Sequence, residues 1–545
     1  MESDESHSSG SAAPAAEHSI EKEAFMSLAH ACPHQPLHYS YALTPSRCFG
    51  LFCSATAADQ LKVEQQCLKC FSDFFPALAP HPSSLSSQIA SPGHPQNQQQ
   101  LQQRGEQGNA EDEEGNADMP IEDLEFLWKR AARQVSLHRS RHVAFLTKHL
   151  DVPFSEEMME LAASRPWLIY WMVHGLALLE ALPRATYADR ILQTLERCWD
   201  SASGGGWGGG PNQQFHLACT YAAAAALVEC GLVGRWLEGE KGLKRRQDLY
   251  KAILSLKSEC GGFKLHRDGE VDMRGAYCAI ATASIFQVLT KDLTRGLAEY
   301  VKSCQGYDGG IAGEPGLESH GGYSYCGLAA LAIIGEPDAL DLDALLHWAA
   351  TKQRGFEGGF QGRTQKLVDS CYSFWLGAMF PLISECLRHL QREYPMTHCF
   401  MSSAHLQQYI LCCCQAENGG LRDKPGKPPD LYHSCYALSG LSISQYAACR
   451  AESSRGPYVY GCWKSNLLQQ TDPFYNVCCT HMQECREQLK QLPRFTAPDT
   501  QHAGQEGDLP RLSAELTDKL SRAAINLHED EGSEWVDPES EAESS

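Results

Sequence analysis

The sequence predicts an all-α fold: an α/α barrel, or toroid, of repeated helical hairpins around a central cavity, with disordered acidic tails. Three observations carry this prediction. Helical periodicity dominates from Ile121 onward, and convincing alternating strands are absent. A Gly-Gly pair followed by an apolar residue recurs at intervals of 48 to 61 residues, a spacing typical of stacked supersecondary units. The negative charge is concentrated at the two ends of the chain.

Charge and composition divide the chain into three parts. Residues 1–120 carry 5 basic and 15 acidic residues and residues 497–545 carry 3 and 13, so each end contributes −10 to the formal charge of −21. We expect 1–120, which includes a Gln-rich run at 96–103, and the acidic tail 497–545 to be mostly disordered. Residues 121–496 are then the folded domain. This part is close to neutral, and the sequence predicts no nucleic-acid partner because such binding needs a basic footprint.

The sequence also predicts a cytoplasmic protein. The chain starts without a basic and apolar leader, and no run of about 18 apolar residues predicts a transmembrane helix. Without a secretory signal, the 24 cysteines are expected to be reduced thiols. The pair Cys67-Leu-Lys-Cys70 fits either half of a zinc site or a short helix with incidental cysteines.

The repeats justify two layers of helices. After each Gly-Gly pair comes a segment rich in Ala, Gly, Ser and Cys, such as 220–227 or 277–284, whose small side chains allow close packing on both faces. The other helix of each unit is more charged, as in 234–241. Inner helices with a charged outer layer indicate a closed barrel or an open solenoid. The pairs are Gly205-Gly206, Gly261-Gly262, Gly309-Gly310, Gly358-Gly359 and Gly419-Gly420.

Four repeats place an ionisable residue near the start of the inner helix and a tyrosine three residues later. Equivalent positions in stacked repeats lie at one height, so we expect an ionisable mouth above an aromatic-lined cavity. The alternative is that these polar residues only cap helices, although Arg and His are poor caps. The residues are Arg274, His320, Asp369 and His433, followed by Tyr277, Tyr323, Tyr372 and Tyr436.

Asp369, Cys371 and His433 form a plausible zinc set within this mouth. Three protein ligands leave a fourth position open, which is the arrangement of a catalytic zinc. Positions i and i+2 share no helix face, so Asp369 and Cys371 converge only where a helix begins. The alternative is a buried cysteine beside a helix cap.

Basic residues precede the same helix. Arg363 and Lys366, together with His320 and Tyr372, are suited to a diphosphate, because Arg binds phosphate in a bidentate manner and Lys supplies a point charge. The alternative is a solvated surface loop. Asp423 follows a Gly-Gly pair and is either a carboxylate for Mg²⁺ beside that diphosphate or an ordinary turn residue.

Trp167 and Trp171, four residues apart, belong either to the core or to the wall of an apolar binding cavity. The stretch 163–171 that contains them is one of several that closely resemble the β subunits of protein farnesyltransferases, in the prenyltransferase β-subunit family. The resemblance covers roughly residues 125–480. The other stretches are 269–274, 319–326, 356–363, 366–375, 420–427 and 431–436.

This resemblance implies a role for each matching position. Asp369, Cys371 and His433 are implied as the ligands of one zinc ion, and Asp423 as the Mg²⁺-linked carboxylate. The residues implied for the diphosphate are His320, Arg363, Lys366 and Tyr372. Those implied for the isoprenoid are Arg274, Tyr277, Gly322, Tyr323, Cys326 and Trp375. Those implied for the peptide substrate are Trp167, Trp171 and Tyr432, with His216 near its last residue.

The resemblance further implies the catalytic subunit of a zinc-dependent farnesyltransferase. Such an enzyme transfers farnesyl from farnesyl diphosphate to the cysteine thiol of proteins ending in Cys-a-a-X, such as small GTPases, through a zinc-bound thiolate. The partner implied is a prenyltransferase α subunit, in a heterodimer. Bulky Trp167 and Tyr436 favour the fifteen-carbon farnesyl group over the twenty-carbon geranylgeranyl group. His216-Leu-Ala-Cys219 departs from the family's His-Leu-Ala-Pro and leaves the preferred residue X open.

Three other functions compete with this one. The nearest is the β subunit of a type I geranylgeranyltransferase, against which Trp167, Tyr436 and Asp423 argue. A terpene cyclase on the same barrel is disfavoured by the zinc set and by Arg363 and Lys366. A non-catalytic helical scaffold would bind no stoichiometric zinc and would tolerate loss of Asp369.

Overall fold

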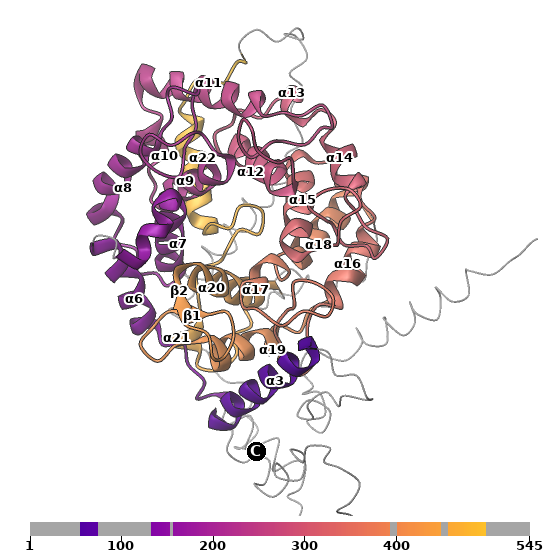
Figure 1. Ribbon diagram of the computed structural model, residues 1–545. Helices are drawn as coiled ribbons and strands as arrows, with labels where there is room; N and C mark the ends of the chain where they lie inside the picture. The colour runs from indigo at the N-terminus through magenta and orange to yellow at the C-terminus, as the bar shows by residue number, and fades with distance from the viewer. Residues whose placement is uncertain (1–54, 75–131, 153–155, 393–399, 448–455, 498–545) are drawn as a thin grey trace, which may run out of the picture.

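The computed structural model describes residues 55–74, 132–152, 156–392, 400–447 and 456–497. Within these residues a closed ring of inner helices forms the core, and each inner helix contacts the next until α20 contacts α7 (Figure 1). The closure confirms the barrel and excludes an open solenoid. The inner helices are α7 (Arg165–Leu178), α9 (Leu217–Glu229), α12 (Met273–Ile285), α15 (Gly321–Ile334), α17 (Tyr372–Trp375) and α20 (Leu431–Tyr446).

A second layer of helices surrounds this ring (Figure 1). The outer helices α6, α8, α11, α14 and α16 each have a buried face and exposed residues on the other face, whereas α9, α12 and α15 are buried almost throughout. The outer helices are α6 (Arg139–Asp151), α8 (Arg184–Cys198), α11 (Gly239–Ser255), α14 (Leu297–Ser303), α16 (Leu342–Ala350) and α19 (Ser403–Gln408). The remaining helical elements of these repeats are η2 (Glu156–Ser164), α10 (Val233–Trp236), α13 (Lys291–Thr294), η3 (Pro337–Ala339), α18 (Met379–His389), the π-helix η4 (Tyr409–Cys414) and α21 (Trp463–Asn466).

The repeated Gly-Gly pairs lie in tight turns between an outer helix and the following inner helix. An isolated antiparallel bridge closes each turn, as between Gln305 and Ile311. The first glycine of each pair has a positive φ, for example +90° at Gly309. A Cβ at Gly309 would lie 2.3 Å from the carbonyl oxygen of Ala344 on the next outer helix, α16. The pairs therefore recur because each turn must pack against the backbone of the next repeat.

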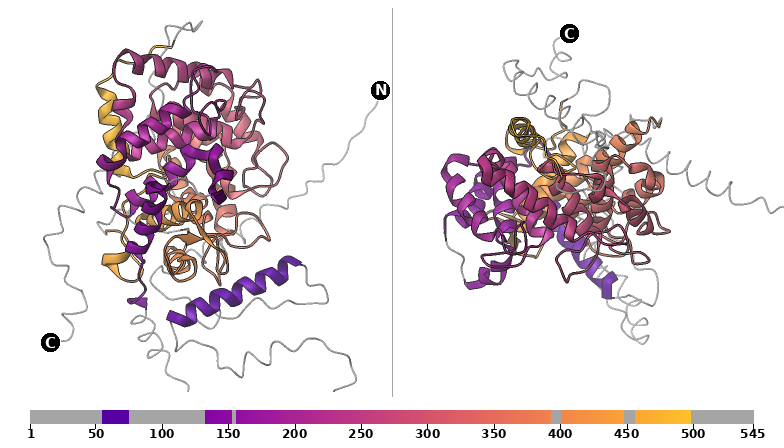
Figure 2. Two further views of the ribbon diagram at one scale, coloured as in Figure 1. Left: turned by 60° about the vertical axis from the view of Figure 1, so that its left-hand side comes forward. Right: turned by 90° about the horizontal axis from the view of Figure 1, so that it is seen from above.

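The last repeat carries the only strands of the described residues. Strand β1 (Leu421–Arg422) pairs antiparallel with β2 (Pro429–Asp430), and the loop between them contains Asp423. Helix α22 (Cys479–Lys490) packs on α9 and α10 (Figures 1 and 2). The loop before it, residues 472–477, is called the axial loop below. It contacts side chains from several inner helices.

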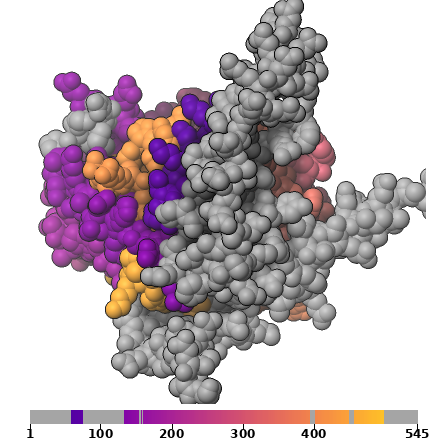
Figure 3. All heavy atoms as spheres, turned by 90° about the horizontal axis from the view of Figure 1, so that it is seen from below, coloured from indigo at the N-terminus to yellow at the C-terminus, as the bar shows by residue number. Residues whose placement is uncertain are grey.

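The N-terminal helix α3 (Ala55–Phe74) packs on η4, and its atoms lie beside those of this repeat in Figure 3. Cys67 and Cys70 both lie on α3, as the alternative of a short helix with incidental cysteines predicts. Both thiols form hydrogen bonds with the thiol of Cys413. Neither belongs to a metal-capable group of the described residues. The disorder predicted for the acidic tail and for most of 1–120 falls outside the described residues. None of the described helices is long and apolar enough to cross a membrane.

Candidate active site

Asp369, Cys371 and His433 meet at one end of the ring, where α17 and α20 begin. Their ligand atoms all lie within 4.8 Å of one another. Cys371 is the buried N-cap residue of α17, and the side chains of Asp369 and His433 are 24% and 17% exposed. Asp369 and Cys371 converge because the carboxylate folds back to accept the Cys371 backbone N–H at 2.9 Å, just ahead of the first helical turn. The sequence thus places three ligand types around one point that solvent can reach.

A carboxylate outside this group fixes the tautomer of His433. Asp430 caps α20, and its second oxygen lies 2.6 Å from His433 Nδ1. Because a carboxylate only accepts, Nδ1 carries the hydrogen. Nε2 faces Asp369 Oδ1 at 3.3 Å. Burial lowers the pKa of His433, but the bonds to Asp369 and Asp430 outweigh this effect and raise the pKa to about 9, so without a metal a proton lies on Nε2 as well. Two acceptors that face each other at this distance need a cation or a proton between them, and a carboxylate behind a ligating histidine is the usual arrangement around zinc.

The separation between His433 Nε2 and Asp369 Oδ1 fits a tetrahedral metal ion. With metal–ligand bonds of about 2.0–2.2 Å, the edge of such a tetrahedron is about 3.3–3.6 Å, a range that includes the 3.3 Å between Nε2 and Oδ1. Burial, followed by the charge of Asp369, raises the pKa of the Cys371 thiol well above its usual range. A cation at the centre of the group would offset both effects. Carboxylate, imidazole and thiolate together form a donor set that zinc accepts.

His320 and Tyr372 meet beside this group. His320 caps α15, where its Nδ1 accepts the backbone N–H of Gly322 at 3.0 Å. Its hydrogen therefore lies on Nε2, which donates to the Tyr372 hydroxyl oxygen at 3.0 Å. Burial and the nearby charge of Arg363 lower the pKa of His320 to about 4, so the ring is neutral at pH 7. The Tyr372 hydroxyl proton is left to donate to an anion at the mouth.

The predicted anion-binding residues surround the same mouth. Arg363 forms an ion pair with Glu318 at 2.9 Å, and Lys366 is exposed on the same loop. Asp423 is half-buried and forms an ion pair with Lys424. Burial, followed by the charge of Asp369, raises the pKa of Asp423, which places its carboxylate in the field of the metal-capable group. Arg363 and Asp423 therefore lie at one rim, and Lys366 lies on the same loop as Arg363.

A closed ring of aromatic side chains lies one turn further along the inner helices. Within the described residues, each member contacts the next, with ring centroids 4.5 to 5.8 Å apart, and the last contacts the first. This aromatic ring gives the end of the barrel an apolar wall below a polar rim. Its members are Trp167, Tyr221, Tyr277, Tyr325, Trp375, Tyr436, Tyr432 and Trp171.

The sequence argument about equivalent positions is wrong in register. His320 is an N-cap, but α12 and α20 are capped by Asp272 and Asp430, so Arg274 and His433 lie two and three residues later. Arg274 instead pairs with Asp272 and Glu270. Capping and mouth formation are therefore not alternatives, because His320 does both.

The register error also misplaced the aromatic residues. Tyr323 and Tyr372 contact the His320 ring at the mouth and are not members of the aromatic ring. Tyr221 and Tyr325 are members that the sequence argument missed. Counting from the caps reveals them, because His216, Asp272 and His320 are each followed five residues later by a tyrosine.

The remaining predicted residues lie around the rim and the aromatic ring. Trp375 Nε1 donates to the Tyr432 hydroxyl at 3.1 Å. His216 caps α9, and its imidazole stands 5.5 Å from that of His266. Cys326 is buried on α15, and Gly322 lies in the first turn of that helix.

A second group also offers ligand types, at the opposite ends of the inner helices. His174, Glu229 and Cys478 are buried, with ligand atoms within 4.8 Å of one another. Here, however, His174 Nδ1 lies only 2.6 Å from Glu229 Oε1. That is a hydrogen bond and is too short for two ligands of one tetrahedral ion, whose separation is about 3.3–3.6 Å.

Comparisons with known proteins agree with this architecture. Residues 137–477 match the family described as the prenyltransferase alpha-alpha toroid domain. The farnesyltransferase β subunit of Pisum sativum is 41% identical over 385 residues, covering 60% of this chain and 90% of that protein. The Arabidopsis thaliana farnesyltransferase β subunit is 36% identical over 415 residues, covering 65% and 83%.

A solved structure supports the fold alone. The protein geranylgeranyltransferase-I of Candida albicans, complexed with GGPP, superposes with a TM-score of 0.52 at 19% identity, covering 65% of this chain and 99% of that one.

The chain belongs to the protein prenyltransferase β-subunit family, and the predicted family and α/α toroid are confirmed. Within this family it is a transferase subunit that takes part in prenyl transfer. The family implies an α-subunit partner and an isoprenyl diphosphate. The role of each site residue stays a prediction.

Proposed function

We propose that this chain is the catalytic β subunit of a protein farnesyltransferase. It transfers farnesyl from farnesyl diphosphate to the cysteine thiol of proteins that end in Cys-a-a-X. The observation that carries the proposal is the position of Asp369, Cys371 and His433 at the rim of the aromatic ring. A site for a thiol-activating metal there adjoins an apolar site for a prenyl chain.

Zinc is the ion we propose for the three ligands, with the fourth position open. When bound, it would lower the pKa of the substrate thiol so that a thiolate is present at neutral pH. The residues of the chain then act on the leaving group. The Tyr372 hydroxyl donates to the diphosphate, and His320 Nε2–H holds that hydroxyl in place. Arg363 and Lys366 supply positive charge, and Asp423 would hold Mg²⁺ beside the diphosphate.

Steric limits support farnesyl as the group transferred. Trp167 contacts both Tyr221 and Trp171, and the rings of Tyr436 and Trp375 are stacked with their centroids 4.5 Å apart. Large side chains therefore occupy these positions of the aromatic ring. A smaller residue at either position would lengthen the apolar site. The peptide would pass along Trp171 and Tyr432 toward His216.

The proposed assembly is a heterodimer with a prenyltransferase α subunit, located in the cytoplasm. The cysteines of the described residues are free thiols, and a reducing compartment maintains that state. The substrates would be Cys-a-a-X proteins such as small GTPases.

Co-expression with an α subunit tests the function. The purified heterodimer is given a Cys-a-a-Met peptide and either farnesyl or geranylgeranyl diphosphate, with and without a zinc chelator. We expect farnesyl transfer that the chelator abolishes and added zinc restores. Preferential geranylgeranyl transfer would instead support a type I geranylgeranyltransferase. No transfer by a folded heterodimer would contradict the proposal and favour a scaffold.

A further inference from the structure

Four consecutive carbonyl groups of the axial loop accept hydrogen bonds from tyrosine hydroxyls of four inner helices. Three of these tyrosines are also members of the aromatic ring. The loop is therefore tied to the side chains that would surround a prenyl chain. The bonds run from Tyr325 to Pro473 at 3.0 Å, from Tyr277 to Phe474 at 2.9 Å, from Tyr221 to Tyr475 at 2.8 Å and from Tyr170 to Asn476 at 2.6 Å.

The loop lies on the far side of the aromatic ring from the metal-capable group. The inner helices begin at the mouth, where His320 and Asp430 cap α15 and α20. The segment that leads into the loop bonds the other end of these helices, because Gln469 N–H donates to the carbonyl of Leu178, the last residue of α7. A prenyl chain whose diphosphate lies at the mouth would therefore point its hydrocarbon end at the axial loop.

The loop is internally braced. The carboxylate of Asp472 accepts the backbone N–H groups of Phe474 at 2.7 Å and of Tyr475 at 3.3 Å. Asp472 N–H donates to the Val477 carbonyl at 2.8 Å. Such a loop moves as a unit, so its position depends on the contacts that hold its C-terminal end, called its base below.

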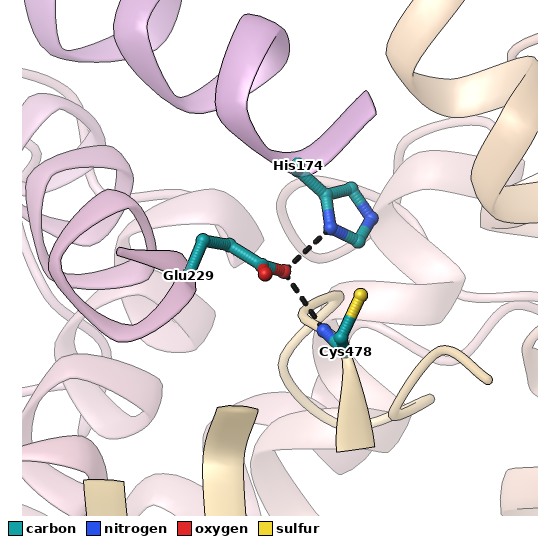
Figure 4. A group of neighbouring side chains, drawn as sticks. All are labelled: His174, Glu229 and Cys478. Carbon is teal, nitrogen blue, oxygen red and sulfur yellow. Dashed lines mark hydrogen bonds and ion pairs between the residues drawn. The ribbon is translucent and has the colours of Figure 1, made fainter. Parts of the chain in front are cut away.

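Glu229 holds that base. It is the last residue of α9 and is fully buried. Its Oε1 accepts the Cys478 backbone N–H at 2.8 Å and lies 2.6 Å from His174 Nδ1 (Figure 4). Its Oε2 lies 2.5 Å from Nδ1 of His481 on α22. Burial raises the pKa of Glu229, but the two histidines outweigh this effect and lower it to about 2.

The anchor also connects to the substrate wall. His174 is stacked on Tyr170, with ring centroids 5.5 Å apart, and its Nε2 lies 3.0 Å from the Ser439 hydroxyl on α20. Tyr170 in turn contacts Trp167, a member of the aromatic ring. One carboxylate thus links α7, α9, α22 and the end of the axial loop.

We propose that Glu229 is a positioning residue for prenyl chain length: it anchors the axial loop, and the anchored loop limits how far a prenyl chain can extend past the aromatic ring. This inference rests on the proposed function. A chain longer by one isoprene unit must displace the loop, which means breaking the four tyrosine bonds together. Loss of the anchor leaves those bonds as the main restraint on the loop and makes the displacement easier.

The test uses the full chain in its heterodimer with an α subunit. Glu229→Gln keeps the size of the side chain but replaces an acceptor oxygen with an NH₂ donor, which then faces His481 or the Cys478 N–H. Glu385→Gln is the matched control, because Glu385 is also buried and paired, with Arg388 on α18, outside the anchor. His481→Phe removes one donor only and serves if Glu229→Gln does not fold.

Two quantities are measured: the ratio of kcat/KM for farnesyl diphosphate to that for geranylgeranyl diphosphate, and hydrogen exchange of the amides of 472–482. For Glu229→Gln we expect faster exchange and a ratio at least tenfold lower. His481→Phe is expected to show a smaller change in the same direction, and Glu385→Gln to stay within twofold of the wild type.

Each contrary outcome points to a different error. Faster exchange with an unchanged ratio would show that the loop does not limit chain length. Unchanged exchange would show that Glu229 is not the anchor. If the wild type transfers neither prenyl group, the proposed function fails and the inference with it, whatever the exchange data show.

Discussion

Replacement of Tyr372 by Phe should slow the chemical step without weakening substrate binding to the same degree. His320 Nδ1 is engaged by the Gly322 N–H, so Nε2–H is donated to the Tyr372 oxygen and the hydroxyl proton is left for the leaving diphosphate. A hydrogen bond to a charged group contributes about 1.5–3 kcal/mol. Because charge on the diphosphate grows in the transition state, kcat should fall by about 10- to 150-fold.

The structure also predicts coupling between the two residues. His320→Asn keeps an acceptor that can cap α15 but loses the Nε2 donor. If His320 acts through the hydroxyl of Tyr372, the double variant should lose less activity than the product of the two single losses. The low pKa of His320, about 4, means that its imidazole stays neutral above about pH 5.5. The wild type and His320→Asn should therefore have pH–kcat profiles of the same shape in that range.

Single-turnover farnesyl transfer to a Cys-a-a-X peptide is the assay, since it separates the chemical step from product release. Tyr446→Phe is the control, because its hydroxyl donates to the Leu468 carbonyl at 2.9 Å, away from the mouth. A Tyr372→Phe rate within twofold of the wild type, or an effect on KM alone, would refute this role for the hydroxyl.

Three further predictions concern chain length, thiol reactivity and folding. Trp167→Thr should raise geranylgeranyl use relative to farnesyl in a competition assay, and an unchanged preference would contradict the steric account. A hydrogen bond from Cys413 lowers the pKa of Cys70 to about 7. The rate of iodoacetamide labelling of Cys70, measured by mass spectrometry of the labelled peptide, should therefore be half-maximal near pH 7. In Cys413→Ala this midpoint should shift to higher pH. Gly309→Ala should lower the free energy of unfolding, measured by urea titration, by about 2 kcal/mol or more, because φ is +90° there and the added Cβ meets backbone atoms. Gly355→Ala is the control: the space around Gly355 is open, and the free energy of unfolding should change by less than about 0.5 kcal/mol.

The fold and the metal-capable group were predictable because both follow from local patterns. The Gly-Gly period marks turns that must pack against the next repeat, and small-residue segments mark the inner helices. Asp369 and Cys371 are two residues apart at a helix start, and the repeat predicts that this start lies at the same end of the ring as the first turn of α20, which carries His433.

The parts that the sequence did not reveal depend on distant pairings. Glu229 meets residues at 174, 478 and 481, and no period or motif connects them. The axial loop follows the last inner helix and bonds four helices at once. Tyr325 was missed because the repeats were aligned on ionisable residues, whereas the helix caps keep the true register.

The zinc content of the purified heterodimer, measured by plasma emission spectroscopy, tests the central claim most directly. The account predicts one zinc per β chain in the wild type and none in Asp369→Ala or His433→Ala. Glu229→Gln should retain one, because the distances around Glu229 are those of hydrogen bonds. A wild type without zinc, or zinc that persists at one per chain in Asp369→Ala and His433→Ala, would contradict the assignment of the metal site.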